Sequence, residues 1–385
     1  MWFSPVVRSI ALISLLAGAA TKVMAEDNSP KPSPTPTATP STPVPFYPPQ
    51  APPPAAPPLP TERTNQEAAP EIDYRVTALQ RDYTGNLWVG GWQGLAQIDP
   101  NNGRVMKRVV VPGGQVTALA EDKSRRIWVG TQEGLWRVDS RTKEITAANY
   151  TLPSNRILSL LVDARGYLWV GTDRGLALIS PDKGLLMTTV QNLPGVSANA
   201  LALDARQQRL WVGTLEGVVQ VDTANGIVRY HISDFPGGTV QALAIDPTGR
   251  LWASTPSGMV TVDTKKRQII STVETLKGRN IQGFKPDRAG SLWLATSAGL
   301  LRFNPADGAL LGQVAGLPSD RVLTVAPDAG NKLWVGTTEG LAWVSYKTFK
   351  SQPMIRLGLW WGGDSWWFRS HSSLNTNVKT ARSRC

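Results

Sequence analysis

The side chains in this sequence that could do chemistry are charged and aromatic residues that recur at two places of a repeated pattern. One place is the residue pair after each Gly-Thr-type step, and the other is the segment that leads into the next repeat. Arginine and tryptophan mixed with carboxylates can hold a sugar or an anionic polymer through ring stacking and bidentate hydrogen bonds. From these places we predict the ligand-binding residues Trp92, Glu133, Arg156, Arg174, Glu216, Arg279, Arg321 and Glu339.

The same two places also hold Gln93, Asp173, Asn199, Asn280 and Asp320. The alternative reading is that all of these are ordinary solvated turn residues. That alternative stays open, because turn positions favour polar side chains whether or not a ligand binds.

Catalytic and metal-binding residue types are scarce. The one Cys, Cys385, is the last residue, so the sequence offers no disulfide framework, no thiolate metal cluster and no Cys-X-X-Cys redox pair. Only two histidines occur, His231 and His371, which argues against a His-rich metal site or a Ser-His-Asp triad. We predict no catalytic residue, no metal and no cofactor, and we expect His231 to lie on an outer strand as a surface residue.

The elements that must position the candidate residues come from one repeat. Its marker is a Trp in a segment such as LWVGT, with successive spacings of 40, 41, 42, 41, 41 and 41 residues; the seven are Trp88, Trp128, Trp169, Trp211, Trp252, Trp293 and Trp334. A Gly follows each Trp by six residues. An Asp precedes it by six residues in six repeats, and by seven in the fourth, at Asp204.

A period of 40 to 45 residues with several strands per unit is typical of propeller blades, because one four-stranded unit cannot bury both of its faces alone. The third repeat predicts strands over 156–162, 168–172, 175–180 and 184–191. We expect the Asp and the Gly to form tight turns, and the Trp to fill the wedge between neighbouring blades. The sequence therefore predicts an all-β fold, a seven-bladed β-propeller of four-stranded blades.

The phase of the repeat predicts where the candidate residues gather. If the first strand of each blade is innermost, the turn after the second strand and the loop into the next blade emerge on one face, around the central channel. The repeat starts at Val76 with an inner strand and ends with an outer strand near 346–352, so we expect blades that share no strand. The join between the first and last blades is then held by packing alone; pairing of residues 71–75 with the last blade would contradict this.

These features resemble the two-component regulator propeller repeat, whose pattern contains Asp-X-X-Gly, Leu-Trp-Val-Gly-Thr, Gly-Leu and a Gly-Leu-Pro-Ser lead-in. The lead-in occurs here as GLPSDR at 316–321, LPSNR at 152–156 and NLPG at 192–195. The resemblance covers about residues 74 to 350. In that family such propellers often form the extracytoplasmic sensory part of hybrid histidine kinases, usually as two stacked propellers followed by a β domain, a membrane helix and the kinase.

This sequence contains one propeller and no kinase, so the resemblance implies recognition of a ligand or partner rather than signalling by a catalytic domain. We expect a binding or sensory module in the cell envelope, with an unknown small ligand, an envelope glycan or an envelope protein as partner. A protein–protein interaction scaffold is the alternative. A propeller lyase that uses carboxylates such as Glu133 or Glu216 is the least favoured.

The ends of the chain are predicted separately. Residues 1–25 are predicted as a signal peptide, because an apolar run over 10–20 precedes small residues at 23–25; an uncleaved anchor is the alternative. Residues 26–70 are predicted as a Pro-rich disordered linker, since 15 of the 30 prolines lie between 29 and 60; a docking site for a Pro-reading partner is the other reading. The propeller is assigned to 71–352.

Residues 353–385 form a basic, Trp-rich tail that departs from the repeat, either the out-of-frame end of a longer gene or a membrane-surface segment. The net charge is +11, but the sequence has no basic stripe interleaved with aromatic residues, so we expect no nucleic-acid partner. We also expect a monomer with no membrane span in the mature chain. The predicted location is periplasmic or secreted.

Overall fold

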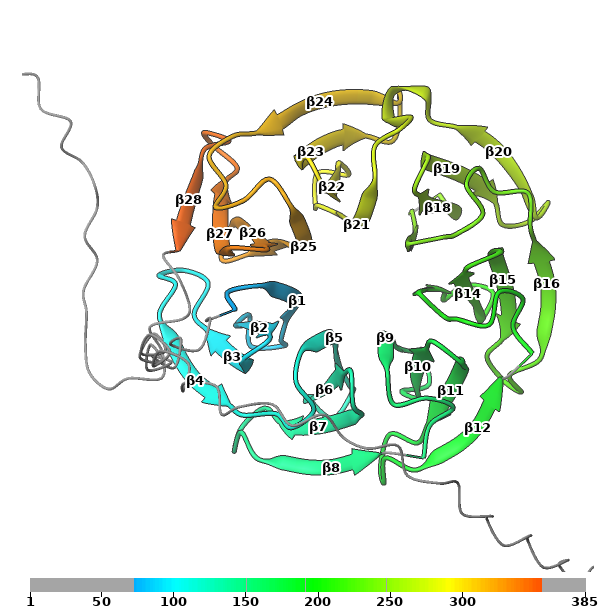
Figure 1. Ribbon diagram of the computed structural model, residues 1–385, viewed down its shortest axis with the longest axis horizontal. Helices are drawn as coiled ribbons and strands as arrows, with labels where there is room; N and C mark the ends of the chain where they lie inside the picture. Colours follow the sequence, from blue (N-terminus) through cyan, green and yellow to red (C-terminus); the bar gives the residue numbers. More distant parts are fainter. Residues whose placement is uncertain (1–72, 150, 191, 247, 355–385) are drawn as a thin grey trace, which may run out of the picture. The chain divides into compact units, whose positions relative to one another are not determined.

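The computed structural model describes residues 73–354, apart from 150, 191 and 247. These residues form seven four-stranded antiparallel sheets, each made of four strands consecutive in the chain. The first strand of each sheet lies nearest the axis of a ring and the fourth lies at its rim (Figure 1). The predicted all-β, seven-bladed propeller is confirmed.

Blades 1 to 4 have the following strands. Blade 1 has β1 (Val76–Arg81), β2 (Leu87–Gly91), β3 (Gly94–Ile98) and β4 (Val105–Val109). Blade 2 has β5 (Val116–Glu121), β6 (Arg126–Thr131), β7 (Leu135–Asp139) and β8 (Ile145–Asn149). Blade 3 has β9 (Ile157–Val162), β10 (Leu168–Thr172), β11 (Gly175–Ile179) and β12 (Leu186–Val190). Blade 4 has β13 (Ala200–Asp204), β14 (Arg209–Thr214), β15 (Gly217–Asp222) and β16 (Val228–Ile232).

Blades 5 to 7 complete the ring. Blade 5 has β17 (Ala242–Ile245), β18 (Arg250–Thr255), β19 (Gly258–Asp263) and β20 (Gln268–Thr272). Blade 6 has β21 (Ile281–Pro286), β22 (Leu292–Thr296), β23 (Gly299–Asn304) and β24 (Ala309–Val314). Blade 7 has β25 (Val322–Ala329), β26 (Lys332–Thr337), β27 (Gly340–Ser345) and β28 (Ser351–Met354). Within the described residues the one helix is a short 3₁₀ turn, Glu274–Leu276.

The core consists of seven apolar clusters, one at each interface between neighbouring blades. Each cluster contains the repeat Trp of one blade together with apolar residues of the next, for example Trp88 with Val116 and Val129. All seven Trp side chains are at most 3% exposed. The prediction that the Trp fills the wedge between blades is confirmed.

The repeated Asp does more than form a turn. One carboxylate oxygen accepts backbone N–H groups of the hairpin, as Asp122 does from Ser124 and Arg126. The other oxygen accepts the indole N–H of the repeat Trp, with Nε1–Oδ2 distances of 2.9 to 3.3 Å in five blades. In blade 4, where Asp204 is one residue further away, the buried Trp211 Nε1 has no partner among the described residues. The Asp therefore ties the hairpin to the core.

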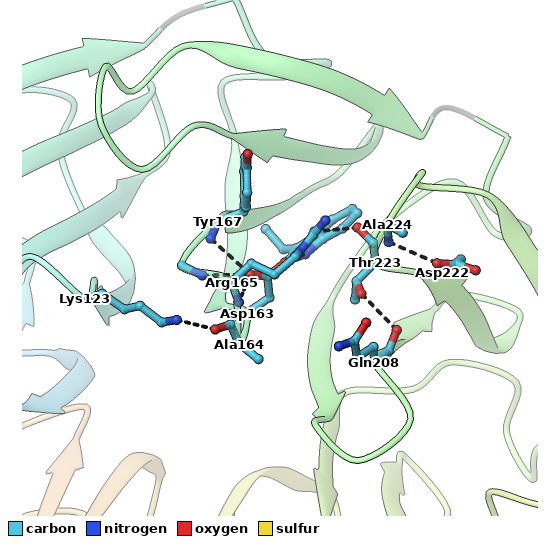
Figure 2. Close-up of polar contacts among 11 residues, drawn as sticks. Lys123, Asp163, Ala164, Arg165, Tyr167, Gln208, Asp222, Thr223 and Ala224 are labelled. Atoms are coloured by element: carbon cyan, nitrogen blue, oxygen red, sulfur yellow. Dashed lines mark hydrogen bonds and ion pairs between the residues drawn. The ribbon is translucent and has the colours of Figure 1, made fainter.

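Basic side chains link neighbouring blades at one end of the ring. This end carries the turns between strands 1 and 2 and between strands 3 and 4 of each blade, and we name it the hairpin face. Arg165 of blade 3 pairs with Asp163 and donates from Nη2 to the carbonyl oxygen of Thr223 in blade 4, at 2.5 Å (Figure 2). Arg126 reaches Pro181 O of blade 3 in the same way, and Arg250 reaches Pro305 O of blade 6. Several cations of this basic chain are thus structural links.

The ring closes without a shared strand in the described residues, as predicted: blade 7 contains only β25 to β28, and residues 73–75 are not in a strand. The prediction that packing alone holds this join is wrong. Lys332 of blade 7 donates from Nζ to the carbonyl oxygens of Pro100 and Asn101 in blade 1. Ring closure therefore uses the same kind of cation-to-carbonyl link as other interfaces.

The predicted signal peptide (1–25), the linker (26–70) and nearly all of the tail (353–385) lie outside the described residues. The last strand, β28, covers 351–354, later in the chain than the predicted outer strand over 346–352. Between residues 73 and 354, with their three gaps, no helix is long and apolar enough to cross a membrane.

Candidate functional site

The end of the ring opposite the hairpin face carries the turns between strands 2 and 3 and the loops that lead into each first strand; we name it the lead-in face. In six blades a Thr at the end of the second strand fixes the turn. Its hydroxyl donates to the carbonyl of the Gly three residues later and accepts the N–H two residues later, as Thr172 does with Gly175 and Arg174. The others are Thr131, Thr214, Thr255, Thr296 and Thr337.

These turns place the predicted residues Glu133, Arg174, Glu216 and Glu339 at the lead-in face, with their backbone N–H groups bound to the Thr and their side chains exposed. The hydrogen bonds shape the backbone and leave the charged ends free to meet solvent or a ligand.

The lead-in loops place Arg156, Arg279 and Arg321 on the same face. Arg156 and Arg321 each follow a Ser whose hydroxyl accepts their backbone N–H, at 3.2 Å, and both side chains are exposed. Arg279 is half-buried after the 3₁₀ turn. The predicted residues therefore share a face but come from six different blades, so they form a ring of side chains rather than one cleft.

The exception is blade 1, where the turn has a pocket. Gly91 stands where the other blades have the Thr, so this turn lacks the hydroxyl that fixes the others. A pocket of about 270 Å³ lies here, with an apolar floor from β2, β3 and the end of β4 and a rim that includes Tyr74, Arg75, Trp92 and Arg108. Trp92 is 48% exposed, which leaves an aromatic surface for stacking.

The lead-in segment sets the charge of the rim. The Arg75 guanidinium lies 5.7 Å from the centre of the Trp92 ring and forms an ion pair with Asp73. Burial raises the pKa of Asp73, but the hydrogen bonds from Arg75 outweigh it and the net pKa is lowered. Burial also lowers the pKa of Arg108. The pocket thus combines the aromatic side chains of Tyr74 and Trp92 with guanidinium groups over an apolar floor.

Sequence reasoning found Trp92 but missed Tyr74, Arg75 and Arg108. The signal that could have pointed to the pocket is the segment WVGGWQG, in which a Gly replaces the repeat Thr directly before a Trp. Gly91 is required by its surroundings, because a Cβ there would lie 2.4 Å from the carbonyl oxygen of Arg75.

The lead-in face also carries buried polar atoms without hydrogen-bond partners among the described residues. They lie in blades 3 to 6, in lead-in loops or at the ends of second strands: Asn155 Oδ1, Asp173 Oδ1, Ser197 Oγ, Gln241 Oε1, Ser254 Oγ and Asn280 Oδ1. Buried polar groups are normally satisfied by protein, water or ligand. At this end of the molecule these atoms can therefore bond to water or to a ligand.

His231 lies on β16, at the rim, with an exposed side chain whose Nε2 is 2.7 Å from the carbonyl oxygen of Glu216. Its predicted surface position is confirmed. Across the described part of the chain no group of three or more His, Cys, Asp or Glu side chains is arranged to hold a metal ion.

The two-component regulator propeller family model matches residues 111–133 and 151–174, in the second and third repeats. The fold is similar to the extracellular domain of the hybrid two-component system BT3049 from B. thetaiotaomicron, with a TM-score of 0.60 and 20% identity over 70% of this chain and 40% of that one. It is also similar to the extracellular domain of the one-component system BT4673 from the same organism, with a TM-score of 0.50 and 18% identity over 73% and 48%.

This chain spans less than half the length of either solved domain. No curated protein sequence matches it. At these identities the likeness concerns the fold.

Proposed function

We propose that this chain, a seven-bladed propeller of two-component regulator propeller repeats, is a binding or sensory module that recognises a ligand in the cell envelope through its lead-in face. The observation that carries the proposal is the pocket of blade 1, which lies on this face and contains the predicted residue Trp92. Ligand pockets combine apolar walls with a few placed polar groups, and this one has that character.

The chemistry of the rim favours a ligand that offers a ring to Trp92 and an acidic or hydroxyl-bearing group to the arginines. A carboxylated sugar has both features, because sugars stack on aromatic rings and carboxylates accept bidentate hydrogen bonds from guanidinium. The unpaired polar atoms elsewhere on the face would serve a larger ligand that extends over several blades.

A periplasmic or secreted location belongs to the same proposal. The two solved domains of similar fold are described as extracellular domains of signalling systems. A propeller that senses an envelope ligand must lie on the side of the membrane where that ligand occurs. The predicted signal peptide at 1–25 would take it there.

The test is a thermal-shift measurement of the full chain against envelope glycans, uronates, nucleotides and small metabolites. A ligand that binds only the folded state must raise the melting temperature. We expect a hit that Trp92→Ala abolishes. Arg174→Ala, in the turn of blade 3, is the matched control: loss with Trp92→Ala alone places the ligand in the blade 1 pocket, and loss with both indicates a ligand that spans the face. A flat panel would overturn the proposal and favour the scaffold function.

A further inference from the structure

A second pocket, of about 430 Å³, lies on the hairpin face between blades 1 and 2. It is lined by the turn between β1 and β2, by β3 and β4, and by residues 140–143 of the hairpin between β7 and β8. It shares no lining residue with the blade 1 pocket on the lead-in face.

In blade 1 the residue directly before the second strand makes no link to the described residues of the next blade. Arg126, Arg250 and Lys332 occupy one repeat position, directly before the second-strand Leu or Ile, and each reaches a backbone carbonyl of the next blade. In blade 1 that position is Asn86, whose amide donates to Thr84 Oγ1 of its own turn at 2.8 Å. Asn86 is therefore held in its own turn, and it lines the pocket.

A lysine enters that space from the opposite side. The backbone N–H of Lys143 donates to the carbonyl oxygen of Asp139, four residues earlier. The residue at the same hairpin position of each other blade makes the equivalent bond. There blades 1, 3, 4 and 6 have a glycine with positive φ, whereas Lys143 holds φ 68°. Its Nζ lies 4.9 Å from the centre of the Trp88 ring and also contacts Ser140 O.

A side chain in the left-handed region costs about 1 kcal/mol or more. Arg267 in blade 5 and Phe349 in blade 7 share this conformation, so the position of the Lys143 ammonium, rather than the backbone strain, distinguishes this interface.

The charge of the pocket is unbalanced. Lys107, Arg141 and Lys143 are cations on its wall, and Asp82 is the one acid. Asp82 is already engaged, since its Oδ2 accepts Trp88 Nε1 at 2.9 Å and Gln97 Nε2 at 2.7 Å. Among the described residues no carboxylate lies within ion-pair distance of Lys143 Nζ.

Burial lowers the pKa of the Lys143 ammonium, against the opposing attraction of Asp82 and Asp139. A positive group that is partly removed from water and forms no ion pair among the described residues favours a negative ligand, because the anion replaces the lost hydration. The hydroxyls of Thr84 and Thr142 on the same wall can add hydrogen bonds to such an anion.

We propose that the pocket between blades 1 and 2 binds an oxyanion group of a small ligand, with Lys143 and Arg141 as the cationic contacts. Carboxylate and phosphate share the required chemistry. The site is independent of the proposed function, because it lies on the opposite face and uses none of the residues of the blade 1 pocket.

The test is a calorimetric titration of the full chain with inorganic phosphate and, separately, with succinate, at ionic strength held constant with NaCl. We expect at least one of them to bind, with Lys143→Gly weakening that binding by at least tenfold. Lys143→Gly installs the residue that four other blades have at this position, so we expect the melting temperature to be kept or raised. Saturation by phosphate identifies a phosphate-bearing ligand, and saturation by succinate a carboxylated one.

The matched control is Arg267→Gly, at the same left-handed hairpin position of blade 5 (φ 59°). We expect it to leave anion binding unchanged, and Trp92→Ala likewise. The proposal is overturned if neither anion binds, or if Lys143→Gly and Arg267→Gly have equal effects on binding. If Trp92→Ala abolishes ligand binding in the blade 1 pocket, the anion titration of the hairpin-face pocket is unchanged. Each of the two proposals can therefore be refuted without the other.

Discussion

At the residue scale, the repeated Asp and Trp act as a pair. The Trp was predicted to fill the wedge between blades and the Asp to form a turn, and both predictions are confirmed. The hydrogen bond between them was not predicted, because spacing along the chain does not reveal that a carboxylate in the hairpin turn meets an indole on the following strand. The same limit hid Tyr74, Arg75 and Arg108, which reach the blade 1 pocket from a lead-in segment and an outer strand.

The first residue-scale prediction concerns pH. Burial raises the pKa of Asp246, but hydrogen bonds from Thr248, the Trp252 indole and Arg250 outweigh it and lower the pKa from 3.8 to about 2. A carboxyl with a lowered folded-state pKa stabilises the fold above its unfolded pKa, and this contribution is lost as the pH falls through the folded value. The shift corresponds to about 2 kcal/mol of the free energy of unfolding, lost between about pH 4 and pH 2.

We therefore expect Asp246→Asn to be less stable than the wild type at pH 7 by about 2 kcal/mol, with a shallower fall in stability below pH 4. Denaturant unfolding at a series of pH values measures both. Parallel pH profiles for the two proteins would show that Asp246 does not carry this contribution.

The second residue-scale prediction concerns Gly91. Gly91→Ala puts a Cβ 2.4 Å from Arg75 O, a backbone atom that cannot move aside freely. We expect a loss of about 1–3 kcal/mol in the free energy of unfolding, as for other overpacked sites, together with a changed blade 1 pocket. Gly283→Ala is the control: its Cβ would meet nothing nearer than 3.9 Å, and blades 1 and 2 have Ala78 and Ala118 at that position. Equal effects of the two variants on denaturant unfolding would contradict the account.

At the element scale, strands could be predicted closely wherever the repeat is regular. The third repeat was predicted to have strands at 156–162, 168–172, 175–180 and 184–191, and β9 to β12 lie within those ranges. The last strand was placed too early. Residues between β27 and β28 form a hairpin in which Phe349 takes φ 54°, and a conformation with positive φ at a bulky residue has no clear sequence signal.

The blades are joined by links that no strand pattern predicts. A long cationic side chain can reach a carbonyl across an interface only after the ring has brought the two blades together. Such links also account for part of the basic composition, because Arg126, Arg165 and Lys332 serve as donors between blades rather than as a surface for anions.

The element-scale prediction tests ring closure. Lys332→Met keeps the aliphatic stem but removes the donor to Pro100 O and Asn101 O, so we expect a loss of about 1–2 kcal/mol in the free energy of unfolding. Arg250→Met is the matched change between blades 5 and 6. We expect a larger loss from Arg250→Met in denaturant unfolding, because Arg250 also forms an ion pair with Asp246 of its own blade. A neutral Lys332→Met would mean that packing alone does close the ring.

At the scale of the whole molecule, the propeller presents two faces with different chemistry. The lead-in face has the aromatic pocket of blade 1 and the unpaired polar atoms of blades 3 to 6, while the hairpin face has the cationic pocket between blades 1 and 2. The sequence could predict the lead-in face, because its turns follow the repeat phase. The two pockets could not be predicted in this way. The blade 1 pocket arises where Gly91 replaces the repeat Thr, and the hairpin-face pocket is formed by side chains of two neighbouring blades.

Amide hydrogen exchange of the full chain can show whether a ligand binds in the blade 1 pocket of the lead-in face. The chain would be compared with and without a ligand found by thermal shift, since binding suppresses local opening of the backbone it contacts. We expect protection concentrated at residues 74–76, 91–96 and 108–111, absent in Trp92→Ala. Protection confined to other blades or to the hairpin face would contradict binding in this pocket.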